Sequence, residues 1–152
     1  MRFMVIVKAS KDSEAGVLPD EKLLTAMGKY NEDLGKAGVL LAGEGLQASS
    51  KGARVRFAGD KRTVAPGPFP ESNDLIAGFW LFQVKSKDEA IEWVKRIPFT
   101  EGEVEIRQVF EAEDFGAALT FEIREQEERL GAAADESVGE LELRKSTTIL
   151  KS

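Results

Sequence analysis

The stretch Gly78-Phe79-Trp80-Leu81-Phe82-Gln83-Val84 decides the fold of this chain. In an extended strand, successive side chains point to opposite faces of the sheet. Large apolar residues therefore fall on both faces, with Phe79 and Leu81 on one and Trp80 and Phe82 on the other. A strand of this kind belongs in the middle of a sheet, where both of its faces are covered.

The segment after this strand has the pattern of a helix followed by a strand. Ser86 and Glu89 are spaced as a capping box, in which the serine accepts from the backbone N–H of Glu89 and the glutamate bonds back. Pro98 ends the helix, and residues 104–109 alternate as a last, half-exposed strand.

The segments before it repeat the same order. Residues 3–7 form a continuous apolar run, which predicts a buried strand. Pro19-Asp20-Glu21 opens a helix that Gly38 closes, and residues 39–42 form the next strand. The apolar stripe of this helix consists of Leu23, Met27, Tyr30 and Leu34.

An insertion lies between the second and third main strands. Residues 53–57 alternate, residues 58–61 turn and residues 62–65 return, which predicts a β-hairpin. The loop Pro66-Gly67-Pro68 follows and is stiffened by its two prolines.

The order of elements is strand, helix, strand, inserted hairpin, strand, helix, strand. This is the split βαβ, or ferredoxin-like, arrangement βαββαβ of an α+β fold, in which the first and third main strands are central. Two helices can cover only one face of such a sheet. We therefore expect a second copy to pack against the other face, which predicts a homodimer.

Charge divides the chain near residue 110. Residues 1–110 carry 16 acidic and 16 basic side chains, whereas residues 111–152 carry 11 acidic and 5 basic ones and account for the net charge of −6. We predict a ferredoxin-like domain over residues 1–110 and an acidic extension over residues 111–152.

The extension has an amphipathic pattern in its first half. A helix is expected over about residues 114–130, with its apolar face formed by Phe115, Leu119, Ile123 and Leu130. Residues 131–135 suggest a linker and residues 141–143 a short strand, with disorder of the last residues as the alternative. The apolar stripe is expected to pack on the chain's own dimer or on another protein.

Composition excludes several classes of chemistry. The chain has no cysteine and no histidine, so thiol nucleophiles, imidazole bases and the usual zinc sites are excluded, and we predict no metal and no cofactor. A pI near 4.9 argues against nucleic-acid binding, and no apolar run is long enough to cross a membrane. A cytoplasmic location is the expectation.

Two carboxylates are the candidate catalytic groups. Glu44 lies in Ala42-Gly43-Glu44-Gly45-Leu46 beside an apolar strand, where it could act as a general base or simply accept backbone N–H groups. Glu71 follows the proline-rich loop and could assist as an acid or ligand clamp, or cap its own turn.

A second set of residues forms the candidate ligand-binding group. Trp80 and Tyr30 could contact a ligand or belong to the core, and Arg56 could anchor an anion or be a solvated hairpin residue. The full set is Gly67, Pro68, Phe69, Trp80, Tyr30 and Arg56.

Three motifs together carry a family resemblance: Ala42-Gly43-Glu44-Gly45-Leu46, Gly67-Pro68-Phe69-x-Glu71 and Gly78-Phe79-Trp80. Over roughly residues 1–110 the chain resembles the YCII-related family, in particular its branch named for an Asp-Gly-Pro-Phe loop. The resemblance implies a dimeric α+β barrel. Some members resemble a chlorohydroquinone dehydrochlorinase, and others accompany alternative sigma factors of the extracytoplasmic type.

The chain departs from the family pattern at its polar positions. Pro66 replaces the loop aspartate, Asn73 replaces a lysine, and no histidine is present for a His-Asp pair. These departures favour a homodimer that binds an unknown small molecule or serves an accessory or regulatory role. The alternative is a lyase or dehydrohalogenase-like enzyme acting on a small aromatic or enolisable substrate, with Glu44 and Glu71 as its acid–base pair.

Overall fold

The computed structural model of the chain describes residues 1–70, 74–118 and 120–149, with side chains as far as residue 139. The chain forms two compact units, Met1–Val109 and Phe110–Ser152, and each is described by itself.

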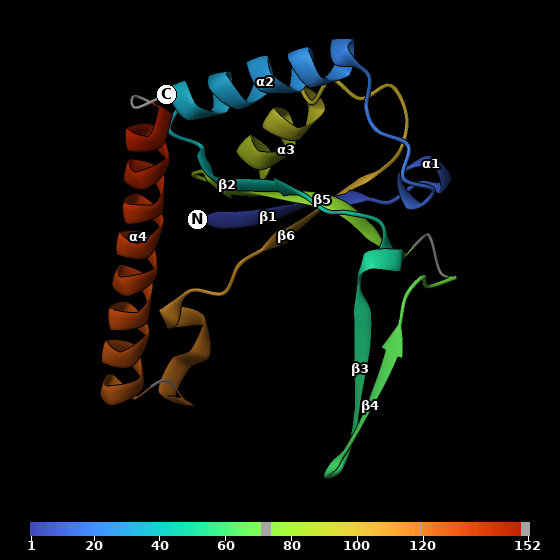
Figure 1. Cartoon of the computed structure of the whole chain (residues 1–152). Helices are drawn as coiled ribbons and strands as arrows, with labels where there is room; N and C mark the ends of the chain where they lie inside the picture. Colours follow the sequence, from blue (N-terminus) through green and yellow to red (C-terminus); the bar gives the residue numbers. More distant parts are fainter. Residues whose placement is uncertain (71–73, 119, 150–152) are drawn as a thin grey trace. The chain divides into compact units, whose positions relative to one another are not determined.

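The first unit is built on a four-stranded antiparallel sheet (Figure 1). Its strands are β1 (Arg2–Lys8), β2 (Leu40–Gly45), β5 (Ile76–Gln83) and β6 (Val104–Gln108), in the order β2-β5-β1-β6. The two strands that are apolar on both faces, β1 and β5, are the central pair, as the sequence predicts. The α+β, ferredoxin-like fold is confirmed.

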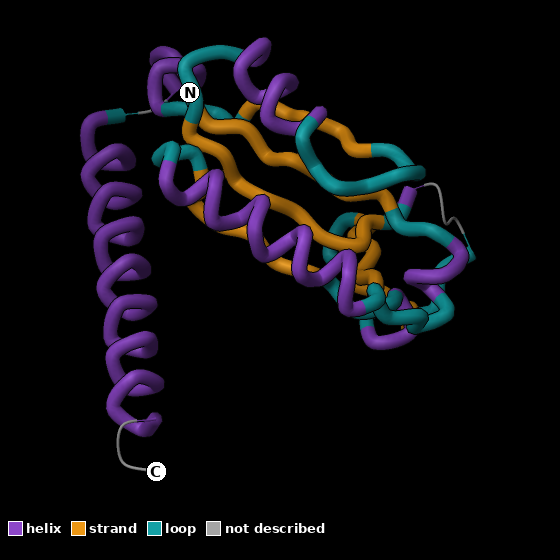
Figure 2. Tube along the Cα trace, turned by 90° about the horizontal axis from the view of Figure 1, so that it is seen from above, coloured by secondary structure: helices purple, strands orange, loops and turns teal. Residues whose placement is uncertain are grey.

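Two helices, α2 (Glu21–Lys36) and α3 (Lys87–Lys95), lie on the same face of the sheet (Figures 1 and 2). The Asp20 side chain caps α2 by accepting from the backbone N–H of Leu23 at 2.8 Å. Gly38 follows the helix with φ of +71°, the left-handed conformation that suits glycine after a helix end.

The cap of α3 differs in one bond from the predicted capping box. Ser86 accepts from the backbone N–H of Glu89 at 3.1 Å, as expected. The Glu89 carboxylate, however, accepts from the backbone N–H of Lys85 at 2.7 Å rather than from that of Ser86.

The core lies between this helical layer and the sheet. Val5 and Trp80 are opposite each other in the register of β1 and β5, as are Phe3 and Phe82. All four are buried beneath the helices, where Leu34 of α2 packs with them.

The other face of the sheet carries a second apolar group. Met4 is opposite Leu81 and Ile6 is opposite Phe79, and all four side chains are half-buried. The helices α2 and α3 lie on the far side of the sheet from these residues (Figure 1). We call this group the open face.

The predicted hairpin forms a separate two-stranded sheet of β3 (Ala53–Ala58) and β4 (Lys61–Pro66). It leaves the four-stranded sheet on the side opposite α2 and α3 (Figure 1). The short helix α1 (Lys11–Glu14) follows β1, and the short helix η1 (Ser49–Lys51) precedes the hairpin. The sequence patterns did not predict either of them.

The second unit contains the 3-10 segment η3 (Ala112–Ala118) and the helix α4 (Phe121–Ile149). The prediction of a helix beginning near residue 114 is wrong, because Gly116 takes φ of 56° and ψ of −136° and interrupts the helical path. Phe115 consequently lies outside α4, and Leu119 lies outside the described residues.

The predicted linker and strand are also wrong, since α4 continues through residues 131–135 and 141–143. Three alanines follow Gly131, and their high helix propensity offsets the cost of about 1 kcal/mol for one glycine. An alternation of three residues is too short to specify a strand. Among the described residues, no helix combines the length and the apolarity that crossing a membrane requires.

Candidate functional site

Two glycines bring β2 and β5 into close contact at the predicted site. A Cβ at Gly43 would lie 2.7 Å from Cδ1 of Trp80, and one at Gly78 would lie 2.9 Å from the carbonyl oxygen of Glu44. Real Cβ atoms do not approach other atoms this closely. Packing between neighbouring strands therefore explains Gly43 of the first motif and Gly78 of the third.

Glu44 lies near the end of β2, opposite Phe79 in the strand register. Its side chain is on the open face, because Phe79 is on that face and paired residues of an antiparallel ladder share a side. Glu44 is exposed, and within the described residues its carboxylate makes no hydrogen bond or ion pair. It is thus a charged group at the margin of an apolar surface.

A hydrogen-bonded connection centred on Ser49 fixes the neighbouring loop. The Ser49 hydroxyl donates to the Glu14 carboxylate at 2.5 Å and accepts from the backbone N–H of Phe69 at 3.0 Å. The backbone N–H of Ser49 also donates to Glu14, at 3.1 Å. One serine therefore joins α1, η1 and the Gly-Pro-Phe loop.

Gly67 is held against the same serine. A Cβ at this position would collide with the Ser49 carbonyl oxygen, and the Gly67 N–H donates to the carbonyl of Gly52 at 3.0 Å. The guanidinium of Arg54 lies 4.0 Å from the centre of the Phe69 ring, a cation–π contact. Pro68, between Gly67 and Phe69, is exposed.

Tyr30 and Trp80 lie in the core rather than at the loop. Their rings meet edge to face with centroids 5.7 Å apart. The Tyr30 hydroxyl donates to the Trp93 carbonyl at 2.8 Å, and the Trp80 indole N–H donates to Asn31 at 2.9 Å. Burial raises the pKa of Tyr30 well above its usual value, while Arg96 lowers it slightly, so the phenol stays protonated.

Arg56 and Glu71 are the remaining predicted site residues. Arg56 is exposed on β3, opposite Thr63 of the hairpin, and it is the neighbouring Arg54 that contacts Phe69. Glu71 lies outside the described residues. The acid–base role of Glu44 and Glu71 stays a prediction.

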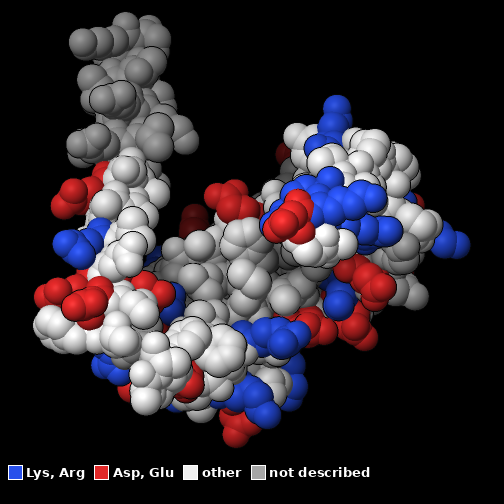
Figure 3. Space-filling model, turned by 90° about the horizontal axis from the view of Figure 1, so that it is seen from below, with Lys and Arg blue, Asp and Glu red and all other residues white. Residues whose placement is uncertain are grey.

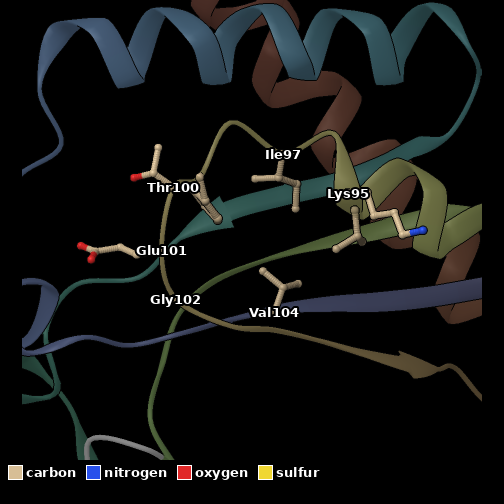
Figure 4. Close-up of a pocket in the computed structure, with 8 residues that line it drawn as sticks. Lys95, Ile97, Thr100, Glu101, Gly102 and Val104 are labelled. Carbon is tan, nitrogen blue, oxygen red and sulfur yellow. The ribbon is translucent and has the colours of Figure 1, made fainter.

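A surface cavity of about 250 Å³ lies at the end of α3 (Figure 4). None of the predicted site residues lines it. Its two charged side chains, Lys95 and Glu101, extend away from each other, so no polar groups converge on its centre (Figure 4). Its lining comprises Val94, Lys95, Ile97, Phe99, Thr100, Glu101, Gly102 and Val104.

Sequence reasoning missed Glu14 and Ser49. Glu14 lies on α1, whose Ser10 and Ser13 cap each other reciprocally, and the spacing of these two serines was the available signal. Ser49 has no signal in the sequence, because its partners are 35 and 20 residues away. Among the described residues, no group of three or more acidic side chains is placed to hold a metal ion.

Comparison with known families agrees with this architecture. The model of the YCII-related domain matches residues 1–113, which include the sheet, both covering helices, the hairpin and the three motifs. No curated protein gives a significant match to the chain. From its fold and from this match over most of its length, the chain belongs to the YCII-related family.

Proposed function

We propose that the protein is a homodimer that binds a small molecule, or serves an accessory role, at a site beside Glu44. The observation that carries this proposal is the open face, where Met4, Ile6, Phe79 and Leu81 lie on the side of the sheet away from α2 and α3. Apolar groups of this size on one sheet face are typical of an interface.

Packing a second copy against the open face accounts for these residues. Complete burial of a large apolar side chain is worth about 1.5–3 kcal/mol, and these four are already half-buried. Burying the rest of each side chain is therefore worth about 1 kcal/mol. In a symmetric dimer each side chain occurs twice in the interface, once from each copy. The sum is enough to offset a substantial part of the cost of association.

Such a dimer would place Glu44 at the edge of a closed apolar layer. A carboxylate beside Phe79 suits a ligand with an apolar body and a hydrogen-bond donor, because the ring contacts the body and the carboxylate accepts the proton donor. The lack of histidine and the replacement of the loop aspartate by Pro66 favour binding over catalysis.

The test combines light scattering with a titration. Size-exclusion chromatography with light scattering is expected to show a dimer at micromolar concentration. Isothermal titration with hydroquinone and chlorohydroquinone, as aromatic probes with donors, is expected to show binding that Glu44→Gln weakens about tenfold, because a charged hydrogen bond becomes a neutral one. Glu32→Gln, an exposed carboxylate on α2, is the matched control.

The outcomes separate the parts of the proposal. A monomer at all concentrations would contradict the dimer. Equal affinity of the Glu44→Gln and Glu32→Gln variants would contradict the site. Release of chloride from chlorohydroquinone that depends on Glu44 would establish the lyase-like alternative instead.

A further inference from the structure

We propose that the β3–β4 hairpin is an arm that docks on the acidic extension of a second copy of this chain. The inference rests on the proposed sheet-to-sheet dimer, and it concerns a surface that the dimer alone does not use. Its basis is the apolar face, the charge and the direction of the hairpin.

One side of the hairpin is apolar and uncovered. Val55 and Val64 are opposite each other in the register, and Phe57 lies two residues further along β3 on the same side. Their exposures are 48%, 65% and 72%. The guanidinium of Arg62, opposite Phe57, lies 4.6 Å from the ring centre. A two-stranded hairpin is marginally stable alone, so a partner on this side would stabilise it.

The hairpin is also the basic part of the first unit. Residues 51–66 contain five basic side chains and one acidic side chain, whereas residues 1–110 as a whole are neutral. Lys and Arg side chains gather over the hairpin in the view from the side opposite the covering helices (Figure 3). The basic side chains of residues 51–66 are Lys51, Arg54, Arg56, Lys61 and Arg62.

The extension has the complementary character. Residues 111–152 carry 11 acidic and 5 basic side chains. On α4, Ile123 and Leu130 are seven residues apart, which places them on one side of the helix, and both are exposed. An apolar stripe within an acidic helix matches an apolar face that carries Arg62, on a hairpin whose other side carries Arg54, Arg56 and Lys61.

The direction of the hairpin points toward the proposed second copy. The hairpin leaves the sheet on the open-face side (Figure 1), where the second copy would lie. Strands of six residues extend about 20 Å and packed sheets are about 10 Å apart, so the hairpin is long enough to reach the second copy. The connection of Ser49 to Glu14 and Phe69 holds the base of the arm in place.

Cross-linking tests the proposal, because the chain has no cysteine of its own. Val64→Cys is introduced in one tagged chain and Leu130→Cys in a differently tagged chain, and the two are co-expressed and treated with a bismaleimide. We expect a covalent heterodimer containing both tags. The control replaces Val64→Cys by Leu24→Cys, an exposed leucine on α2, and is expected to give little product.

Charge reversal provides the second measurement. Lys61→Glu with Arg62→Glu is expected to lower the cross-linked fraction about tenfold, because like charges then face each other. Lys22→Glu with Lys29→Glu on α2 makes the same change in net charge and is expected to leave the cross-linked fraction unchanged.

The results distinguish this inference from the dimer itself. A dimer by light scattering without a Val64–Leu130 product would overturn the arm and leave the sheet interface standing. A third chain carries both Val64→Cys and Leu130→Cys, and a cross-link that forms only within this chain would overturn the proposal, because the hairpin would then dock on its own extension. A protein that is monomeric throughout would overturn both proposals.

Discussion

Ser49 holds three parts of the first unit together through one hydroxyl. Its Oγ donates to Glu14 and accepts from Phe69, while its carbonyl packs against Gly67. The sequence patterns mark Gly67 and Phe69 as loop residues of interest, but they do not mark Ser49 or Glu14. Hydrogen bonds between residues 20 or 35 positions apart have no local signature, so only the folded chain reveals them.

Substitution Gly67→Ala tests this close packing. The added methyl group would overlap the Ser49 carbonyl, so the loop must move, and we expect a loss of about 1–3 kcal/mol in the free energy of unfolding. Urea denaturation followed by tryptophan fluorescence measures this loss. Gly45→Ala is the control, since no atom lies within 4 Å of a Cβ there. Equal free energies of unfolding for the two variants would show that the loop can move without loss of stability.

At the scale of elements, local patterns predicted the main strands and helices because each carries its own periodicity and caps. The hairpin formed as expected around its turn, and Asp20 and Ser86 cap their helices. The extension was predicted poorly. Gly116 and Gly131 look alike in the sequence, yet the first interrupts the chain with a positive φ and the second lies inside α4.

Substitution Ser86→Ala tests the cap of α3. It removes the side-chain acceptor of the Glu89 N–H, and the expected loss is about 1 kcal/mol in the free energy of unfolding. Urea denaturation monitored by circular dichroism provides the measurement. Ser50→Ala, an exposed serine, is expected to change stability by less than about 0.5 kcal/mol. A loss for Ser50→Ala as large as that for Ser86→Ala would argue against a specific capping effect.

At the scale of the whole molecule, the open face is an apolar surface of the first unit that α2 and α3 do not cover. Leu81 and Met4 are opposite each other on it, and both are half-buried. The alternation within β5 predicted this second apolar face, and both α2 and α3 lie on the other side of the sheet (Figure 1).

Substitution Leu81→Arg tests the sheet interface. A charged side chain at the centre of the proposed contact would be buried without a partner, and we expect the dimer to dissociate into folded monomers. Light scattering measures the mass, and near-ultraviolet circular dichroism checks that the tryptophans remain packed. Leu24→Arg on α2 is the control and is expected to remain dimeric. A Leu81→Arg variant that is still dimeric would place the interface elsewhere.

The sequence by itself determined the ferredoxin-like fold, since periodicity, caps and strand order are local properties that add up to one topology. It also supplied the family through three short motifs. Tertiary structure decided what these motifs do: Gly43, Gly67 and Gly78 permit close contacts, and Trp80 and Tyr30 belong to the core. It also placed Arg54 over the Phe69 ring and left Glu44 exposed opposite Phe79. Such outcomes depend on which distant segments meet, and no local pattern encodes that.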